Sequence, residues 1–191
     1  EPCIIDNIPP VSDIETLQVK DKKFAVSIPE AEILKQVKRV AGEINRDYEG
    51  REPLFLAVLN GAFIFAADLM KEVVLPSEIQ FIKLASYEGT TSTGAVTETI
   101  GMTADISGRD VVIIEDIVDT GLTMQHLVDS LSARSPRSIA ICSLLVKPAN
   151  LKIDLDIRYK CFEIPNDFIL GYGLDYDQQG RQLKDIYVLK D

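Results

Sequence analysis

The sequence lacks the cysteine and histidine groupings that build disulfide frameworks and zinc sites. Its three cysteines, Cys3, Cys142 and Cys161, form no C-x-x-C pair and are odd in number, so a disulfide framework is not expected and a zinc site still less. The only histidine, His126, falls within an expected helix, and we assign it a structural or surface role. This pattern of cysteine usage is typical of the reducing cytoplasm.

Long apolar stretches and an excess of basic residues are also missing. Apolar runs are broken within about ten residues, whereas a membrane-spanning helix needs roughly 20. The start of the chain, residues 1–4, shows no basic region leading into an apolar stretch, so no signal peptide is expected. The 30 acidic residues outnumber the 20 basic ones, which argues against a nucleic-acid surface. A phosphate-rich ligand would therefore have to be bound by backbone N–H groups and metal ions.

Of the 191 residues, 46% are hydrophobic, which is enough for the chain to build its own core. No repeat, low-complexity tract or linker divides it, so residues 1–191 are predicted to form a single domain. We expect its core at about 27–150 and a small hood built from the N-terminal arm and about 151–191. Residues 1–26 show little periodicity and are expected to be irregular or a short edge structure.

Apolar periodicity predicts strands that alternate with helices. Ser27 and Glu30 resemble a capping box before the first helix, and 87–97, rich in Gly, Thr and Ser, is expected to be a loop. The alternation indicates an α/β fold with a mainly parallel sheet flanked by helices and a small C-terminal flap. The expected helices are 29–47, 62–73 and 121–133, and the expected strands are 54–59, 79–86, 111–115, 138–146, 159–162, 168–169 and 186–189.

The strongest chemical signal is the segment Glu115-Asp116-Ile117-Val118-Asp119-Thr120-Gly121-Leu122-Thr123. It starts where an apolar strand ends in two adjacent acids, and ligands of open α/β sheets bind beyond the carboxyl ends of the strands. Gly121 allows close backbone approach, the next helix begins with unpaired N–H groups, and Thr120 and Thr123 add hydroxyls, which together suit one phosphate group. The paired acids suit ribose hydroxyls or a bound Mg²⁺. A helix merely capped by Asp119 would leave the two acids and the second threonine unexplained.

This segment resembles the binding signature for 5-phosphoribosyl-1-pyrophosphate (PRPP) in type I phosphoribosyltransferases. Further motifs in the same order resemble the hypoxanthine-guanine branch of that family, and the likeness runs over about 54–190. Leu59-Asn60-Gly61-Ala62 resembles the branch's pyrophosphate loop, and Ser86-Tyr87 resembles the start of its catalytic lid. Lys147 follows the fourth strand, like the branch's purine-contacting lysine. The stretch from Phe168 to Tyr176, with Arg181, resembles its base-binding flap.

The resemblance implies transfer of the 5-phosphoribosyl group from PRPP to hypoxanthine or guanine in purine salvage, with Mg²⁺ as cofactor. It implies that Asp119 is the base that accepts the N7 proton, and that Lys147 donates to the C6 oxygen and so rejects adenine. The implied PRPP-binding residues are Glu115, Asp116, Asp119, Thr120, Gly121, Leu122 and Thr123, and the implied metal ligands are Asp175, Glu115 and Asp116. The implied pyrophosphate-binding residues are Asn60, Gly61, Ser86, Tyr87 and Arg181, and the implied purine-binding residues are Lys147, Phe168, Ile169 and Asp175.

The chain departs from the family at two positions. Asn60 and Leu122 stand where family members can carry lysine, and we expect little loss because backbone N–H groups bind the phosphates there. The family's turn at Leu59–Asn60 often contains a cis peptide, so this bond is a candidate for one.

Two other functions remain open at the level of sequence. A pyrimidine or adenine phosphoribosyltransferase is disfavoured by Lys147, Phe168 and Asp175. A PRPP-sensing regulator without catalysis is disfavoured by the net charge of -10 and by the presence of Asp119, Lys147 and Arg181. The resemblance also implies a homodimer or homotetramer without nucleic-acid or membrane partners. The preferred 6-oxopurine depends on backbone contacts that composition and pattern do not reveal.

Overall fold

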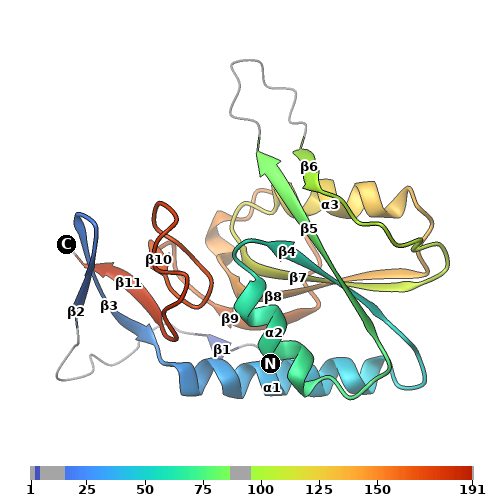
Figure 1. Ribbon diagram of the computed structural model, residues 1–191, viewed down its shortest axis with the longest axis horizontal. Coiled ribbons are helices and arrows are strands. Elements are labelled where there is room, and N and C mark those ends of the chain that lie inside the picture. The colour runs from blue at the N-terminus through green and yellow to red at the C-terminus, as the bar shows by residue number, and fades with distance from the viewer. Residues whose placement is uncertain (1–2, 5–15, 87–95, 191) are drawn as a thin grey trace.

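The computed structural model describes residues 3–4, 16–86 and 96–190 and contains two β-sheets (Figure 1). In the larger sheet the strand order is β1-β9-β8-β7-β4-β5-β6, and every neighbouring pair is parallel except β5 with β6. The mainly parallel α/β fold predicted from the sequence is therefore confirmed. Its strands are β1 (Cys3–Ile4), β4 (Leu54–Leu59), β5 (Glu78–Ser86), β6 (Val96–Ile100), β7 (Asp110–Val118), β8 (Ser138–Val146) and β9 (Tyr159–Glu163).

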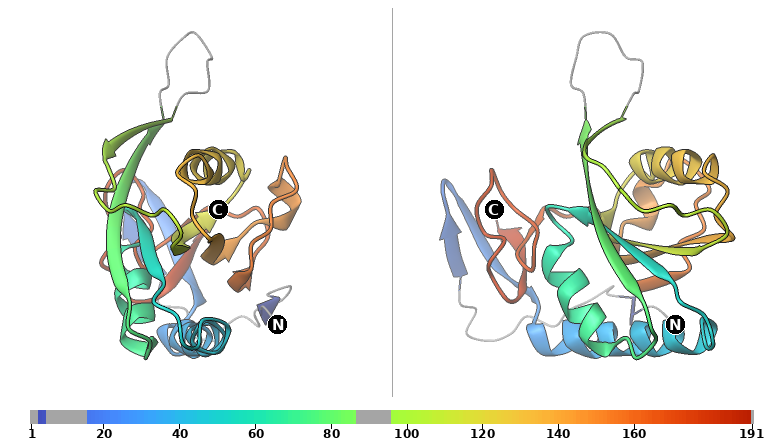
Figure 2. Two further views of the ribbon diagram at one scale, coloured as in Figure 1. Left: turned by 90° about the vertical axis from the view of Figure 1, so that its right-hand side faces the viewer. Right: turned by 45° about the vertical axis from the view of Figure 1, so that its right-hand side comes forward.

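Helices cover both faces of the larger sheet (Figure 2). Because successive strand residues point to opposite faces, Phe55 packs with α1 (Glu30–Asp47) and α2 (Phe63–Glu72), whereas Leu56 packs with α3 (Leu122–Ser132). The central strands are buried on both faces and so read as continuous apolar runs. Within the described residues, no helix is long and apolar enough to cross a membrane.

The smaller sheet combines segments from both ends of the chain. Its strand order is β10 (Ile169–Leu170), β11 (Ile186–Lys190), β3 (Lys22–Ile28) and β2 (Thr16–Val19), and all pairs are antiparallel. Phe24, Leu170 and Tyr187 form part of its own apolar cluster. This sheet is the hood, but β1 and β9, which also lie in the segments assigned to the hood, belong to the larger sheet instead. The reason is that Cys161 and Phe162 of β9 are buried in the main core. The assignment of residues 1–191 to one domain stays a prediction.

Residues 16–26 lie in the β2–β3 hairpin, and β2 is the short edge strand of the smaller sheet, so the expected edge structure is confirmed for this part of the segment. Leu17 and Phe24 are cross-strand partners within the hood's apolar cluster. Residues 5–15 lie outside the described part of the chain. The capping box is absent, since Ser27 lies within β3 and the N-cap residue, Pro29, makes no side-chain cap. The first N–H of α1 instead donates to a carboxylate oxygen of Asp185, at 2.7 Å.

Two element boundaries also differ from the prediction. β7 does not end at the paired acids but continues through them to Val118, because 115–118 remain paired with β8. The expected loop 87–97 ends earlier, since Val96 and Thr97 already pair with β5 as part of β6. Residues 87–95 lie outside the described part of the chain.

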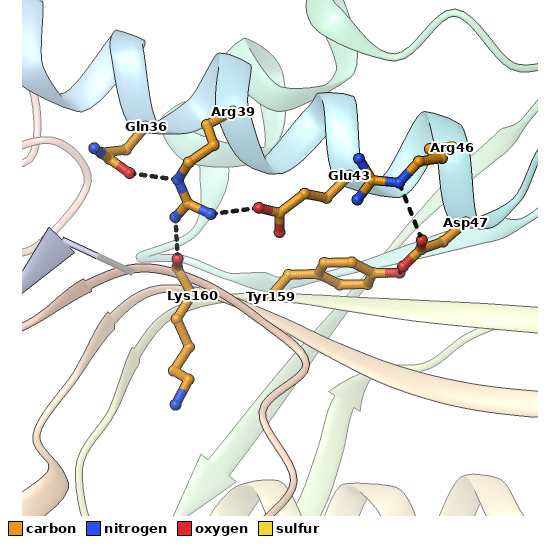
Figure 3. Close-up of polar contacts among 7 residues, drawn as sticks. All are labelled: Gln36, Arg39, Glu43, Arg46, Asp47, Tyr159 and Lys160. Carbon is orange, nitrogen blue, oxygen red and sulfur yellow. Dashed lines mark hydrogen bonds and ion pairs between the residues drawn. The ribbon is translucent and has the colours of Figure 1, made fainter. Parts of the chain in front are cut away.

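The guanidinium of Arg39 connects α1 to strand β9 (Figure 3). It donates to the side chains of Gln36 and Glu43, each at 2.7 Å, and to the backbone carbonyl of Lys160 at 2.6 Å. Because one planar group donates hydrogen bonds both to side chains of the helix and to the backbone of the strand, the helix is held at a defined position over the sheet.

Candidate active site

The two adjacent acids, Glu115 and Asp116, lie near the carboxyl end of β7. Glu115 is only 8% exposed, and it accepts the N–H of Asp116 at 3.0 Å. Burial raises the pKa of Glu115 well above its usual range, and the neighbouring charge of Asp116 adds to the effect. Such a pair suits a ligand that brings hydroxyl donors or a cation to the carboxyl end of the sheet.

A pocket of about 110 Å³ lies directly beyond these acids. Gly121 has a φ of 82° and is the N-cap residue of α3, so Asp119 does not cap this helix. The N–H of Leu122 donates to the hydroxyl of Thr120 at 3.4 Å. The first N–H groups of a helix have no intrahelical acceptor, so a helix start can bind an anion. Leu122 is 48% exposed and does not line the pocket. The lining residues are Glu115, Ile117, Val118, Asp119, Thr120, Gly121, Thr123 and Met124.

Asp119 and Lys147 come together beside this pocket. The Lys147 ammonium lies 3.9 Å from a carboxylate oxygen of Asp119, and the lysine side chain is only 11% exposed. Two asparagines complete the cluster, because Asn150 donates to Asp119 at 2.8 Å and to Asn166 at 2.7 Å. Our sequence analysis missed both asparagines. Their positions, three residues after Lys147 and two before Phe168, are the only local signal that could have drawn attention to them.

A second group of contacts surrounds the turn after β4. The Leu59–Asn60 peptide is cis, as the resemblance suggested. Gly61 is packed so tightly that a Cβ atom there would collide with the carboxylate of Asp116. On the other side, a Cβ atom on Gly173 would overlap the carbonyl oxygen of Gly61. The turn, the acids of β7 and the C-terminal flap therefore meet at one point.

The flap itself is held by Arg181 and by aromatic packing. Arg181 donates to the carbonyl of Gly173 at 2.8 Å and forms a 3.0 Å ion pair with Asp175. The Phe168 ring is 45% exposed, with the rings of Phe24 and Tyr176 at 6.1 and 5.7 Å. An exposed aromatic face that is supported from behind offers a surface for a flat ligand.

The structure thus brings the predicted residues together in two contact groups, one around Asp119 and Lys147 and one around Gly61 and Asp116. Ile169 lies in β10, next to Phe168 and opposite Val188 of β11. Ser86 is the last residue of β5. Neither its side chain nor Tyr87 belongs to the part of the chain that the structure describes.

No group of three or more His, Cys, Asp or Glu residues that could hold a metal occurs in the described ranges. The carboxylates of the site fit a Mg²⁺ ion of the kind that uses one or two protein ligands and fills its sphere with substrate phosphates and water.

Comparison with known proteins agrees with this geometry. The family described as "Phosphoribosyl transferase domain" matches residues 29–177, and the chain belongs to it. The hypoxanthine-guanine phosphoribosyltransferase of Streptococcus mutans is 40% identical over 163 residues, which cover 85% of this chain and 91% of that protein. The bifunctional TilS/HprT protein of Listeria monocytogenes is also 40% identical, over 166 residues, and there the chain spans only 26% of the relative.

Solved structures lead to the same branch of the family. The crystal structure of a hypoxanthine-guanine phosphoribosyltransferase from Bacillus anthracis superposes with a TM-score of 0.84 at 38% identity. The superposition covers 91% of this chain and all of that one. The fold of this chain is therefore the type I phosphoribosyltransferase fold.

Proposed function

We propose that this chain transfers the 5-phosphoribosyl group of PRPP to hypoxanthine or guanine, giving IMP or GMP and pyrophosphate in purine salvage. The observation that carries the proposal is the placement of the Lys147 ammonium 3.9 Å from the Asp119 carboxylate, beside the pocket at the start of α3. An acid and a donor at this spacing match the N7–H and C6 oxygen on one edge of a 6-oxopurine. The relatives at 40% identity support the same reaction.

In the proposed complex, the pocket at the start of α3 holds the 5-phosphate through backbone N–H groups and the hydroxyls of Thr120 and Thr123. Glu115 and Asp116 face the ribose hydroxyls. The bond from the anomeric carbon to pyrophosphate breaks, a bond to the purine nitrogen forms, and Asp119 accepts the proton from N7. Because Asp119 is held at a defined position, its contribution lies in geometry more than in basicity.

The purine lies between Lys147 and the hood. Lys147 donates to the C6 oxygen, and the exposed face of Phe168 stacks on the ring. Ile169 and Asp175 read the opposite edge through backbone groups. Adenine carries an amino group at C6, which is a hydrogen-bond donor and cannot accept a bond from the Lys147 ammonium, so adenine is rejected.

Pyrophosphate lies against Asn60 and Gly61, with Arg181 and the lid residues Ser86 and Tyr87. Asp175 and the acid pair, Glu115 and Asp116, are the residues that would hold Mg²⁺. When bound, this ion neutralises charge on the leaving pyrophosphate. That role answers the problem of a chain with net charge -10 that binds a polyanion.

The proposal extends to a homodimer or homotetramer in the cytoplasm. Buried, unpaired Cys142 and Cys161 are compatible with a reducing compartment. The oligomeric state rests on the resemblance to the hypoxanthine-guanine branch, and size-exclusion chromatography with light scattering would measure it.

An absorbance assay with PRPP, Mg²⁺ and, in turn, hypoxanthine, guanine, xanthine, adenine and uracil tests the proposed reaction. We expect turnover with hypoxanthine and guanine. Turnover confined to adenine or uracil would contradict the assignment of the base site. PRPP binding without turnover of any base would favour a regulator of the same fold.

A further inference from the structure

We propose that Asn150 is a positioning residue that keeps the carboxylate of Asp119 from pairing directly with the ammonium of Lys147, so that both groups can bind one edge of a purine. Asn150 belongs to none of the motifs by which the sequence resembles its family. The inference rests on the proposed function, because it assigns a role relative to the proton acceptor and the C6-oxygen donor of that reaction.

Both hydrogens of the Asn150 amide are engaged in the cluster. Its Nδ2 lies 2.8 Å from Oδ1 of Asp119 and 2.7 Å from Oδ1 of Asn166. A carboxylate only accepts hydrogen bonds, so Asn150 must present its NH₂ group to Asp119. The Asn166 oxygen also lies 3.5 Å from Nζ of Lys147. A chain of polar contacts thus runs from the acid through two amides to the ammonium.

Backbone hydrogen bonds hold both ends of this chain in place. The N–H of Lys147 donates to the carbonyl of Val118, and the N–H of Lys152 donates to that of Thr120, each at 3.0 Å. Asp119 lies between the two acceptor residues, and Asn150 lies between the two donor residues. The two bonds therefore fix the separation of these two segments. The freedom that remains to Asp119 is the rotation of its side chain, which is 47% exposed. Asn150 removes that freedom by binding one carboxylate oxygen.

The consequence is a gap between the two charged groups. At 3.9 Å, Lys147 Nζ and Asp119 Oδ2 are farther apart than in a direct charge-assisted hydrogen bond, which measures about 2.7–2.9 Å. Without Asn150, the carboxylate could rotate until it bonds directly to the ammonium. The acceptor of Asp119 and the donor of Lys147 would then be used by each other and not by the purine. The N7–H and C6 oxygen of the purine would then have to break an ion pair before they could bind.

A double-mutant cycle tests the inference. We expect Asn150→Ala to lower kcat/KM for hypoxanthine about tenfold, the loss expected for one hydrogen bond to a charged group, with the KM for PRPP unchanged. In an Asp119→Asn background, the same substitution should change the rate less than about twofold, because Asn150 acts through that carboxylate. A tenfold loss in both backgrounds, or in neither, would overturn the inference.

Two further variants separate positioning from folding. Asn150→Asp keeps the shape but places a second negative charge 2.8 Å from Asp119 Oδ1, so it should lose at least as much activity; wild-type activity in this variant would also overturn the inference. Asn45→Ala is the matched control, since Asn45 likewise makes two hydrogen bonds, to the backbone of Glu72 and Val74. It should lower stability without changing kcat. Absence of turnover in the wild-type protein would refute the proposed function itself, whereas wild-type turnover that Asn150→Ala leaves intact refutes only this inference.

Discussion

Gly173 of the flap lies directly against the carbonyl oxygen of Gly61, so closely that a Cβ atom at position 173 would overlap that oxygen. Gly173 also has a φ of 102°, a conformation that residues with a side chain rarely adopt. Its own carbonyl accepts a hydrogen bond from Arg181. The contact therefore joins the proposed purine and pyrophosphate sites through backbone atoms alone.

Gly173→Ala should separate the flap from the turn after β4. We expect kcat/KM for PRPP to fall by about tenfold or more, since a displacement of about 1 Å can cost 10²-fold, and stability to fall by about 1–3 kcal/mol. Steady-state kinetics and urea denaturation measure both effects. Gly42→Ala is the control, because a Cβ atom on that helical residue would meet nothing within 4 Å; it should stabilise the protein by about 0.5–1 kcal/mol. Wild-type kinetics for Gly173→Ala would show that the contact is dispensable.

Asp119→Asn should reduce turnover by roughly 10²-fold or more, because an amide oxygen cannot accept the N7 proton as a carboxylate can. PRPP binding, measured by calorimetry, should be nearly unchanged, since the 5-phosphate is held by the backbone at the start of α3. Asp129→Asn, which removes an exposed acid from α3, should leave turnover intact. Unchanged turnover in Asp119→Asn would refute the assignment of the base.

Lys147→Ala should weaken hypoxanthine binding and narrow the discrimination between hypoxanthine and adenine. The physical reason is that a buried donor rejects a ligand that presents a second donor, and this penalty disappears with the ammonium. The ratio of kcat/KM values for the two bases measures the effect. The same ratio in wild-type protein and Lys147→Ala would contradict the specificity argument. Lys35→Ala, at an exposed lysine of α1, should leave the ratio unchanged.

Asp47 gives the contact between α1 and β9 a pH dependence. Asp47 lies beside Tyr159 (Figure 3). Burial alone would raise the pKa of Asp47, but hydrogen bonds from Tyr159 at 2.8 Å and Arg158 at 3.0 Å outweigh burial and lower the pKa below its usual value. A lowered carboxylate pKa stabilises the folded state above the unfolded pKa, and this stability is lost as pH falls through the folded value. Asp47→Asn should therefore cost about 1 kcal/mol at pH 7, and the difference from wild type should shrink as pH falls below about 3.8.

Urea unfolding at pH 7 and at about pH 3.5 tests this prediction. The exposed Asp154 provides the control, because Asp154→Asn should show little difference at either pH. A destabilisation by Asp47→Asn of equal size at both values would mean that the charge of Asp47 plays no part.

Continuous segments of the sequence determined the core of the fold and the first half of the site. Apolar periodicity predicted the strand at 54–59 and the helix near 121–133, and the two acids that follow an apolar run predicted a ligand site near the carboxyl end of β7. These features depend on neighbours within about ten residues, so a local pattern is sufficient to predict them. That strand, that helix and the two acids together predict where the pocket at the start of α3 lies.

Only the tertiary structure decided the features that depend on residues far apart in the chain. Asp185 caps α1 across 155 positions, and Asn150 reaches Asp119 across 31. The hood pairs β3 with β11 from opposite ends of the chain. In each case one side chain or strand forms hydrogen bonds with polar groups of a distant segment. The residue pattern within either segment does not identify that partner.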